Sequence, residues 1–261
     1  MVVSLVDALI AGWKETSLID VHGAVTFTVW FCGCNLRCPF CHNHRLADVE
    51  PGVCRWVPVR GGEGSIEEAL SHAARFIDYV HVTGGEPLVQ VRAVAELFKA
   101  AKEMDVKTSL NTNLTLTGPL KELLSEGLVD HVATDLKTPL REMTGITDEG
   151  ALRNIVKSYE SSLEAIAENK GVVLELRIPI AKNLTLRTLP QALKEVEPIL
   201  KHLGDRVYVI VNPLLGPPIT DPRDRKWCEE YCWPSEEELE EAYRIVTEAG
   251  FKAFKGRLPV K

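Results

Sequence analysis

Residues 79–111 read YVHVTGGEPLVQVRAVAELFKAAKEMDVKTSLN, and this stretch indicates the fold. Residues 79–83 and 106–111 are short segments whose aliphatic side chains, at 80 and 82 and at 106 and 110, fall at even spacings, which is typical of strands. Residues 91–104 lie between them and repeat their apolar side chains with a helical period. A connection of this length lets a helix cross over the sheet, so we expect the two strands to be parallel. The stretch therefore predicts a β/α/β unit.

The same alternation extends in both directions from this unit. Strands are expected at residues 24–30, 79–83, 106–111, 129–135, 172–179 and 207–212. Helices are expected at residues 66–77, 91–104, 119–126, 152–167, 189–202 and 235–249. About six β/α units predict an α/β fold, a partial (β/α)6 TIM-like barrel with a C-terminal helical extension. We expect one domain over residues 1–261, with its core at about 17–213 and the extension at 214–261.

Two segments do not follow this alternation. Residues 47–65 include Gly61, Gly62 and Gly64, and residues 213–234 are rich in proline and charge. Both are longer than most connections in a compact domain. We therefore expect them to be lids or loops that contact a substrate or frame a groove for a partner.

The composition excludes several classes of protein. The 261 residues are 45% hydrophobic and 26% charged, which excludes a disordered chain, a collagen and a small disulfide scaffold. The net charge of -7 and the lack of a basic run argue against nonspecific nucleic-acid binding. Residues 1–13 lack the pattern of a signal peptide or membrane anchor, so a cytoplasmic location is expected. Seven cysteines in such a chain indicate metal or redox chemistry, unless the source is a hyperthermophile.

A cysteine-rich loop follows the first expected strand. Cys34, Cys38 and Cys41 are separated by three and then two residues. A turn of this length can place three thiols on one face of a metal cluster. No fourth cysteine lies at a matching spacing in the loop, so the simplest interpretation is a [4Fe-4S] cluster with one open iron. The alternative is a structural zinc site made by these cysteines and His44.

An open iron can bind a small molecule, and a low-potential cluster beside a sulfonium can donate one electron and break a carbon–sulfur bond. The C-x3-C-x2-C loop, with Phe40 before its third cysteine, resembles the signature of the radical S-adenosylmethionine (SAM) superfamily. Its string GCNLRCPFCHN is most similar to the activating enzymes of glycyl radical enzymes, including the activators of anaerobic ribonucleotide reductase and pyruvate formate-lyase. The resemblance covers about residues 17–213.

The resemblance implies an activity and its participants. Cys34, Cys38 and Cys41 would ligate the [4Fe-4S] cluster and act as the catalytic residues. SAM would be cleaved to methionine and a 5′-deoxyadenosyl radical, which takes hydrogen from a glycine of a partner glycyl radical enzyme. An electron donor of flavodoxin or ferredoxin type would reduce the cluster. A small molecule or a tRNA base is the alternative substrate, although the net negative charge argues against tRNA. A zinc-stabilised binding protein without catalysis is the remote alternative.

The resemblance also implies a set of residues that bind SAM, one in the cysteine loop and the others at or near the ends of the strands. They are Phe40, Gly84, Gly85, Glu86, Asn111, Asp135, Lys137, Arg177 and Asn212. The Gly-Gly-Glu-Pro string would meet the amino group of SAM, and an Asp-x-Lys motif would lie beside its methionine part. Each feature also has a simpler explanation, namely a turn for the glycines, a cap for the asparagine and a solvated ion pair for the Asp-x-Lys motif.

Several positions leave alternatives open. Arg177 needs an anionic partner within an apolar run, and either the cofactor's carboxylate or Glu175 could supply it. Asn111 stands where activating enzymes usually have aspartate, and Leu114 where they have glycine, which puts a monovalent cation site in doubt. Residues 20–23 read DVHG rather than the DGPG of formate-lyase activators, which weakens assignment to that group.

Four cysteines lie outside the loop motif. They are Cys32, Cys54, Cys228 and Cys232. They could bind zinc or a second cluster, but reduced structural cysteines or a stabilising disulfide are the favoured interpretation.

Overall fold

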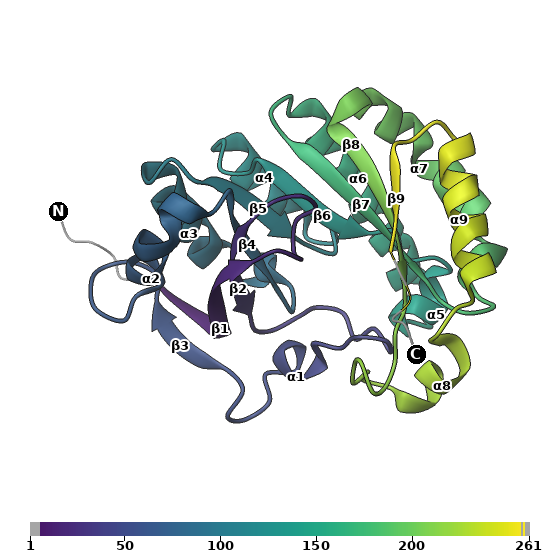
Figure 1. The fold of residues 1–261 in the computed structure, drawn as a ribbon, viewed down its shortest axis with the longest axis horizontal. Helices are drawn as coiled ribbons and strands as arrows, with labels where there is room; N and C mark the ends of the chain where they lie inside the picture. Colours follow the sequence, from purple (N-terminus) through teal and green to yellow (C-terminus); the bar gives the residue numbers. More distant parts are fainter. Residues whose placement is uncertain (1–5, 257, 259–261) are drawn as a thin grey trace. The chain divides into compact units, whose positions relative to one another are not determined.

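The computed structural model describes residues 6–256 and residue 258 (Figure 1). Contacts divide the chain into two compact units. The first holds the described residues of Met1–Asn35 and Arg45–Ala133, and the second holds those of Leu36–His44 and Thr134–Lys261. None of the described helices is long and apolar enough to cross a membrane. The expectation of one domain over the whole chain stays a prediction.

The first unit is built on a mixed sheet (Figure 1). Its strands are β1 (Asp7–Ser17), β2 (Thr26–Phe31), β3 (Arg55–Pro58), β4 (Tyr79–Gly84), β5 (Lys107–Asn111) and the first residues of β6 (His131–Asp135). They lie in the order β3-β1-β2-β4-β5-β6, with β2, β4, β5 and β6 parallel. β1 runs antiparallel to both of its neighbours, β2 and β3.

The parallel strands of this unit form its core. In β2 the successive side chains of Phe27, Thr28 and Val29 are all fully buried, so both faces of the strand are covered. Helices α2 (Ile66–Ala73), α3 (Val91–Glu103) and α4 (Thr117–Ser125) follow the strands as crossover connections. α3 buries Val94, Leu97, Phe98 and Ala101, which share one face of a helix.

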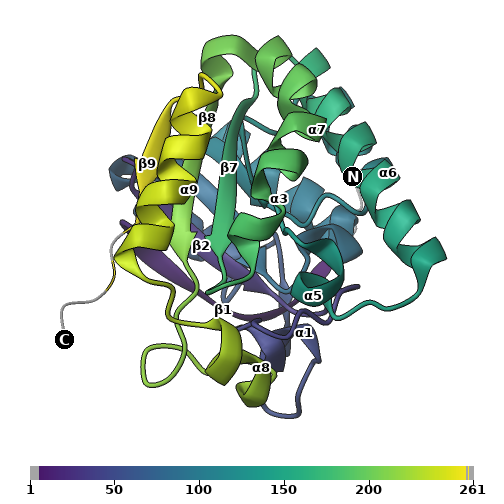
Figure 2. The same cartoon turned by 90° about the vertical axis from the view of Figure 1, so that its right-hand side faces the viewer.

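The second unit has three parallel strands covered by helices (Figure 2). The strands are β7 (Val173–Ile180), β8 (Val207–Pro213) and β9 (Ala253–Lys255). The helices are α5 (Leu140–Thr144), α6 (Glu149–Glu168), α7 (Leu189–Leu203), α8 (Arg225–Tyr231) and α9 (Glu236–Glu248). The last helix lies along β8 and β9. The second unit also receives the end of β6, where the amide of Leu136 donates to the carbonyl of Arg177 over 2.8 Å.

All six expected strands are confirmed, with starts within two residues and ends within one residue of the observed bounds. All six expected helices are confirmed as well, although the first ends in a short 3-10 turn, Ala74–Phe76. The sequence missed β1, β3 and β9, so the cysteine loop follows the second strand rather than the first. β1 reads DALIAGWKETS and is mostly half-buried or exposed, which gives it no continuous apolar run.

The two segments expected to be loops contain short regular elements. β3 lies within residues 47–65, and α8 lies within residues 213–234. The helix α1 (His44–Ala47) was also missed. These elements of four to seven residues are too short for a helical or alternating period to stand out in the sequence.

The start of α9 gives a first test of the fold. The Ser235 hydroxyl accepts a hydrogen bond from the Glu238 amide, and the Glu238 carboxylate accepts one from the Ser235 amide. We expect Ser235→Ala to lower the free energy of unfolding by about 1 kcal/mol, because the cap is lost. Urea denaturation followed by circular dichroism measures this loss. The control Ser235→Asp keeps a capping acceptor and should stay close to the unsubstituted protein, and an equal loss in both variants would contradict the capping role.

Candidate functional site

The ends of β2 and β4 are packed backbone against backbone. β4 pairs with β2 so that Gly84 lies opposite Phe31, and the Gly85 amide donates to the Phe31 carbonyl over 2.8 Å. A Cβ on Gly84 would lie 2.3 Å from the Phe31 carbonyl oxygen, and one on Gly85 would lie 2.1 Å from that of Gly33. Gly84 also has a φ of 114°, which other residues rarely adopt. Only glycines fit here, directly beside the start of the cysteine loop.

Glu86 is a buried carboxylate that connects three segments of the first unit. Glu86 is 1% exposed, and its carboxylate accepts hydrogen bonds from the Thr112 hydroxyl at 2.8 Å and the Asn113 backbone amide at 2.7 Å. It also accepts from the Leu88 amide at 3.1 Å, while its own amide donates to the Gly33 carbonyl over 2.7 Å. These bonds offset the cost of burying the carboxylate and join the end of β4 to β5 and the cysteine loop.

The turn after β5 contacts the cysteine loop through side-chain amides. The side-chain amide of Asn113 donates to the side-chain oxygen of Asn35 over 2.9 Å. The side-chain amide of Asn35 in turn donates to the Thr115 hydroxyl over 2.6 Å. Asn111 donates to the Thr83 hydroxyl over 2.8 Å, so it joins the ends of β5 and β4. Sequence reasoning missed Asn35 and Thr115, because nothing in the pattern shows that two distant turns meet.

The cysteines fall into two chemical groups. Cys32–Cys54 and Cys228–Cys232 are disulfides, which decides the state that the sequence left open for these four residues. Cys34, Cys38 and Cys41 form no disulfide. The three cysteines with the motif spacing are therefore the ones that can serve as thiolate ligands.

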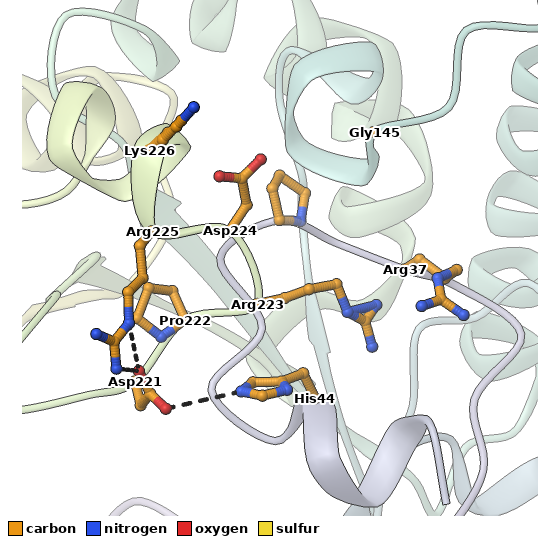
Figure 3. Close-up of a pocket in the computed structure, with 10 residues that line it drawn as sticks. Arg37, His44, Gly145, Asp221, Pro222, Arg223, Asp224, Arg225 and Lys226 are labelled. Carbon is orange, nitrogen blue, oxygen red and sulfur yellow. Dashed lines mark hydrogen bonds and ion pairs between the residues drawn. The ribbon is translucent and has the colours of Figure 1, made fainter. Parts of the chain in front are cut away.

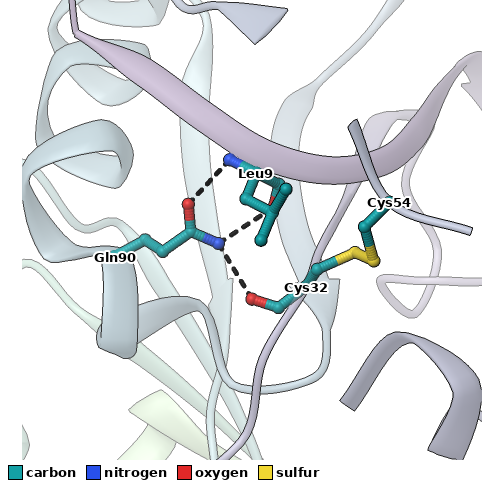
Figure 4. The surroundings of a disulfide bond; sticks show 4 residues. All are labelled: Leu9, Cys32, Cys54 and Gln90. Carbon is teal, nitrogen blue, oxygen red and sulfur yellow. Dashed lines mark hydrogen bonds between the residues drawn. A yellow bond between two sulfur atoms is a disulfide. The ribbon is translucent and has the colours of Figure 1, made fainter. Parts of the chain in front are cut away.

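The first disulfide lies just before the cysteine loop (Figure 4). The Cys32 amide donates to the Leu9 carbonyl over 2.9 Å, and the Cys32 carbonyl accepts from the Gln90 side chain at 2.9 Å. Gln90 also bonds both backbone groups of Leu9, which makes it a bridge between β1 and the residue two before Cys34. Gln90 was not expected from the sequence.

The rest of the loop is packed within the second unit. Cys38 is buried, and the Cys41 amide donates to its carbonyl over 3.2 Å. The segment before α8 lies against this turn, because the Arg223 amide donates to the Cys41 carbonyl over 3.1 Å. The adjacent Asp224 amide donates to the Pro39 carbonyl over 2.9 Å.

Phe40, which was expected to contact the cofactor, has a packing role in the structure. Its ring lies 5.9 Å from that of Trp227, whose ring lies 5.0 Å from that of Tyr231. These aromatic residues cover a small buried cluster that includes Met143. Trp227 and Tyr231 lie on α8, so this helix, which sequence analysis did not predict, supports the cysteine loop.

The charged residues expected at the ends of β6 and β7 form two pairs. Lys137 and Asp135 are 2.9 Å apart with 11% and 31% of their side chains exposed, so this is not a fully solvated pair. Burial raises the pKa of the Asp135 carboxyl, but the charges of Lys137 and Arg177 outweigh burial and hold that pKa below its usual range. Arg177 pairs with the buried Glu175, which is the partner that the sequence gave as an alternative to the cofactor.

Asn212 lies near the end of β8, close to the chain that follows β9. A Cβ on Gly256 would lie 2.8 Å from the Asn212 side-chain oxygen, so a glycine allows this close approach. The Gly256 amide also donates to the Val211 carbonyl over 2.8 Å. Gly256 thus lies beside the expected cofactor residue.

The donor set fits an iron–sulfur cluster. Three thiols that form no disulfide lie within eight consecutive residues, and thiolates are the ligands that such clusters take. Across the part of the chain that the structure describes, no three His, Cys, Asp or Glu side chains are grouped to hold a single metal ion.

Comparison with known families agrees with this donor set. Residues 28–196, more than half of the chain, match the model of the Radical SAM superfamily. The matched region includes the cysteine loop and the ends of β4, β5, β6 and β7. Because this is a family of enzymes, the remote alternative of a non-catalytic binding protein finds no support.

Several curated proteins are similar to this chain. A Methanocaldococcus jannaschii protein, named as a glycyl-radical enzyme activating enzyme, is 31% identical over 132 residues, which are 50% of each chain. The pyruvate formate-lyase-activating enzyme of Clostridium pasteurianum is 30% identical over 72% of this chain and 77% of its own length. The 7-carboxy-7-deazaguanine synthase of Hyperthermus butylicus is 32% identical over 46% of this chain and 47% of its own. This chain thus spans about half the length of two of the three.

A solved structure shows the same fold. A radical SAM methyltransferase from Sphaerobacter thermophilus superposes with a TM-score of 0.60 at 16% identity, covering 88% of this chain and 66% of its own. This likeness confirms the α/β fold class with a partial barrel, and α9 confirms the C-terminal helical extension.

The close packing of the glycines gives a second test. We expect Gly85→Ala to displace the Gly33 peptide, because the new methyl group would overlap its carbonyl oxygen. The midpoint of urea unfolding should fall, and less iron should be bound after reconstitution. Gly118→Ala is the matched control, since a Cβ there meets no atom within 4 Å, and it should bind iron normally. Equal iron content in both variants would contradict the role of Gly85 in positioning the backbone before Cys34.

The low pKa of Asp135 gives a third test. A carboxyl whose folded pKa lies below the unfolded value of 3.8 adds stability above that pH and loses it as the pH falls toward the folded pKa. We therefore expect Asp135→Asn to lower the urea midpoint at pH 7, and this difference should shrink below about pH 4. Asp205→Asn is the control, because Asp205 is exposed, and it should change the urea midpoint little at either pH. A difference that stays constant with pH would contradict the assignment.

Proposed function

Since the chain belongs to the radical SAM superfamily, we propose that Cys34, Cys38 and Cys41 hold its [4Fe-4S] cluster and that it cleaves SAM reductively. The family implies both the cluster and SAM as cofactors. When bound, they supply a 5′-deoxyadenosyl radical that abstracts hydrogen from the substrate. The observation that carries this proposal is that three cysteines with the motif spacing form no disulfide while the other four are paired.

The residues proposed to bind SAM lie in the cysteine loop and at the strand ends. They are Phe40, Gly84, Gly85, Glu86, Asn111, Asp135, Lys137, Arg177 and Asn212. The glycines keep side chains away from the end of β4, so a ligand can approach the backbone there. The partly buried pair of Asp135 and Lys137 offers fixed charges of both signs, which suits a zwitterionic amino acid group.

For the substrate, we propose a backbone glycine of a partner glycyl radical enzyme. Two relatives support this choice, the Methanocaldococcus protein at 31% identity and the Clostridium activating enzyme at 30%. The GCNLRCPFCHN string in this chain resembles the same group of activating enzymes. The contribution of the chain is to hold the glycine beside the reacting carbon and to exclude water.

A small-molecule substrate is the second candidate. It is supported by the likeness to the 7-carboxy-7-deazaguanine synthases of Hyperthermus butylicus and Methanopyrus kandleri, at 32% and 34% identity. Both matches cover less than half of this chain.

The reaction class is tested by anaerobic reconstitution with iron and sulfide, followed by SAM and dithionite. We expect a brown protein that releases 5′-deoxyadenosine, measured by chromatography. Cys38→Ala should abolish both colour and product, because a proposed cluster ligand is lost. Cys32→Ala/Cys54→Ala is the matched control, since it removes two cysteines but keeps the three ligands. Product from Cys38→Ala, or a colourless wild-type protein that carries zinc, would overturn the assignment.

The substrate class is tested with the same reconstituted protein. Incubation with a glycyl radical enzyme from the same organism should give a glycyl radical signal by electron paramagnetic resonance. Formation of 7-carboxy-7-deazaguanine from the small-molecule fraction of a cell extract, without a glycyl radical, would favour the second candidate instead.

A further inference from the structure

A cavity with several charged residues in its lining opens beside the cysteine loop within the second unit (Figure 3). Its volume is about 670 Å³. One wall is made by Arg37, Pro39 and His44 of the loop region, and the other by the segment Asp221–Lys226. These two stretches are far apart in the sequence, and the second is the charged segment that sequence analysis set aside as a substrate or partner loop.

The lining of this cavity is cationic although the whole chain is acidic. It carries four cations, Arg37, Arg223, Arg225 and Lys226, against two carboxylates. The chain as a whole has a formal charge of -7. The excess of positive charge is therefore local and favours an anionic partner at this face.

The two carboxylates of the cavity are already engaged. Asp224 caps α8 by accepting from the Trp227 amide at 3.0 Å. Asp221 accepts from Arg225 at 2.8 Å and lies 4.0 Å from the His44 ring nitrogen. Figure 3 shows Arg225 turned toward Asp221, whereas Lys226 points away from the other labelled side chains. The exposed cations thus form a rim that a large partner can reach.

This rim is attached directly to the turn that carries two of the proposed cluster ligands. The Arg223 amide bonds the carbonyl of Cys41, and the Asp224 amide bonds that of Pro39, the residue after Cys38. α8, which carries Arg225 and Lys226, is held by the ring contact between Trp227 and Phe40. A partner seated on the rim lies close to the ligating cysteines, and short distances are what electron transfer requires.

The position of two cations also argues for a role in binding. Arg225 and Lys226 are the first residues of α8, at the end of the helix dipole that is unfavourable for positive charge. Both are exposed, and neither is needed to fill a core. Local helix stability would favour acidic residues at these two positions.

We propose that Arg37, Arg225 and Lys226, with Arg223 at their base, form the docking surface for a small acidic electron-carrier protein of ferredoxin or flavodoxin type. This inference rests on the proposed function, because it concerns the reduction of the same cluster. One electron leaves the carrier, which is oxidised, and enters the cluster, which is reduced, and no proton or group is transferred. Complexes of this kind have small interfaces, below about 1,200 Å², and depend on charge complementarity for their association rates.

The test uses the double charge reversal Arg225→Glu/Lys226→Glu in the reconstituted protein. Its matched control is Lys194→Glu/Lys201→Glu on α7, which changes the net charge equally at two exposed lysines. Both pairs contain one residue in an exposed ion pair, Arg225 with Asp221 and Lys201 with Glu197. The new glutamates at the start of α8 suit the helix dipole, so the variant should fold.

Two quantities are measured against an acidic flavodoxin. Titration calorimetry with oxidised flavodoxin gives the Kd, and stopped-flow absorbance gives the rate at which reduced flavodoxin reduces the cluster. We expect the rim variant to raise Kd by at least about tenfold at low salt, with the difference nearly gone near 0.5 M salt, where charges are screened. The reduction rate at limiting flavodoxin should fall similarly, while 5′-deoxyadenosine formation driven by dithionite should stay unchanged.

Other outcomes separate this inference from the proposed function. Equal weakening in the rim variant and the α7 control would assign the effect to net charge and overturn the docking surface. An unchanged Kd in the rim variant, or no binding by the wild-type protein, would also overturn it. If dithionite gives no 5′-deoxyadenosine with any variant, the proposed function fails, and the Kd values still report on the rim.

Discussion

The contact between the end of β4 and the backbone beside it is the constraint on which the site depends. Two adjacent residues without side chains, Gly84 and Gly85, let the carbonyls of Phe31 and Gly33 approach closer than any Cβ would permit. The Glu86 carboxylate and the Gln90 amide then bind the neighbouring backbone from the same turn. The peptide that leads into Cys34 is therefore fixed by backbone packing, buried hydrogen bonds and a disulfide, all contributed from outside the loop.

Much of the fold was predictable because its core strands and helices are long and regularly patterned. The strands that sequence analysis missed are of another kind. β1 has exposed residues over much of its length and a glycine at position 12, and β9 has only three residues. Such strands form because a neighbouring strand already exists to pair with, as β9 does beside β8, so their signal is in the tertiary structure.

The functional site likewise combines features that the local sequence predicts with features that only the tertiary structure shows. The spacing of Cys34, Cys38 and Cys41 is local in the sequence and was predictable, as was the pairing of Arg177 with Glu175 as one of two alternatives. The contacts of Asn35 with the turn after β5, and of α8 with Phe40, were not. Leu114 is instructive, because it adopts a left-handed φ of 58° at the position where the resemblance to activating enzymes implies a glycine. The sequence shows the departure, and only the structure shows the conformation that explains the usual residue.

The disulfide at Cys32 has a consequence for how the protein matures. Two positions along the chain, Cys34 must remain a thiolate if it is to bind iron, so one short peptide carries cysteines in opposite oxidation states. A thiolate is the nucleophile in disulfide exchange, and ligation to iron removes that nucleophile from the reaction. An iron bound at Cys34 would therefore also protect the nearby Cys32–Cys54 bond from attack by that thiolate.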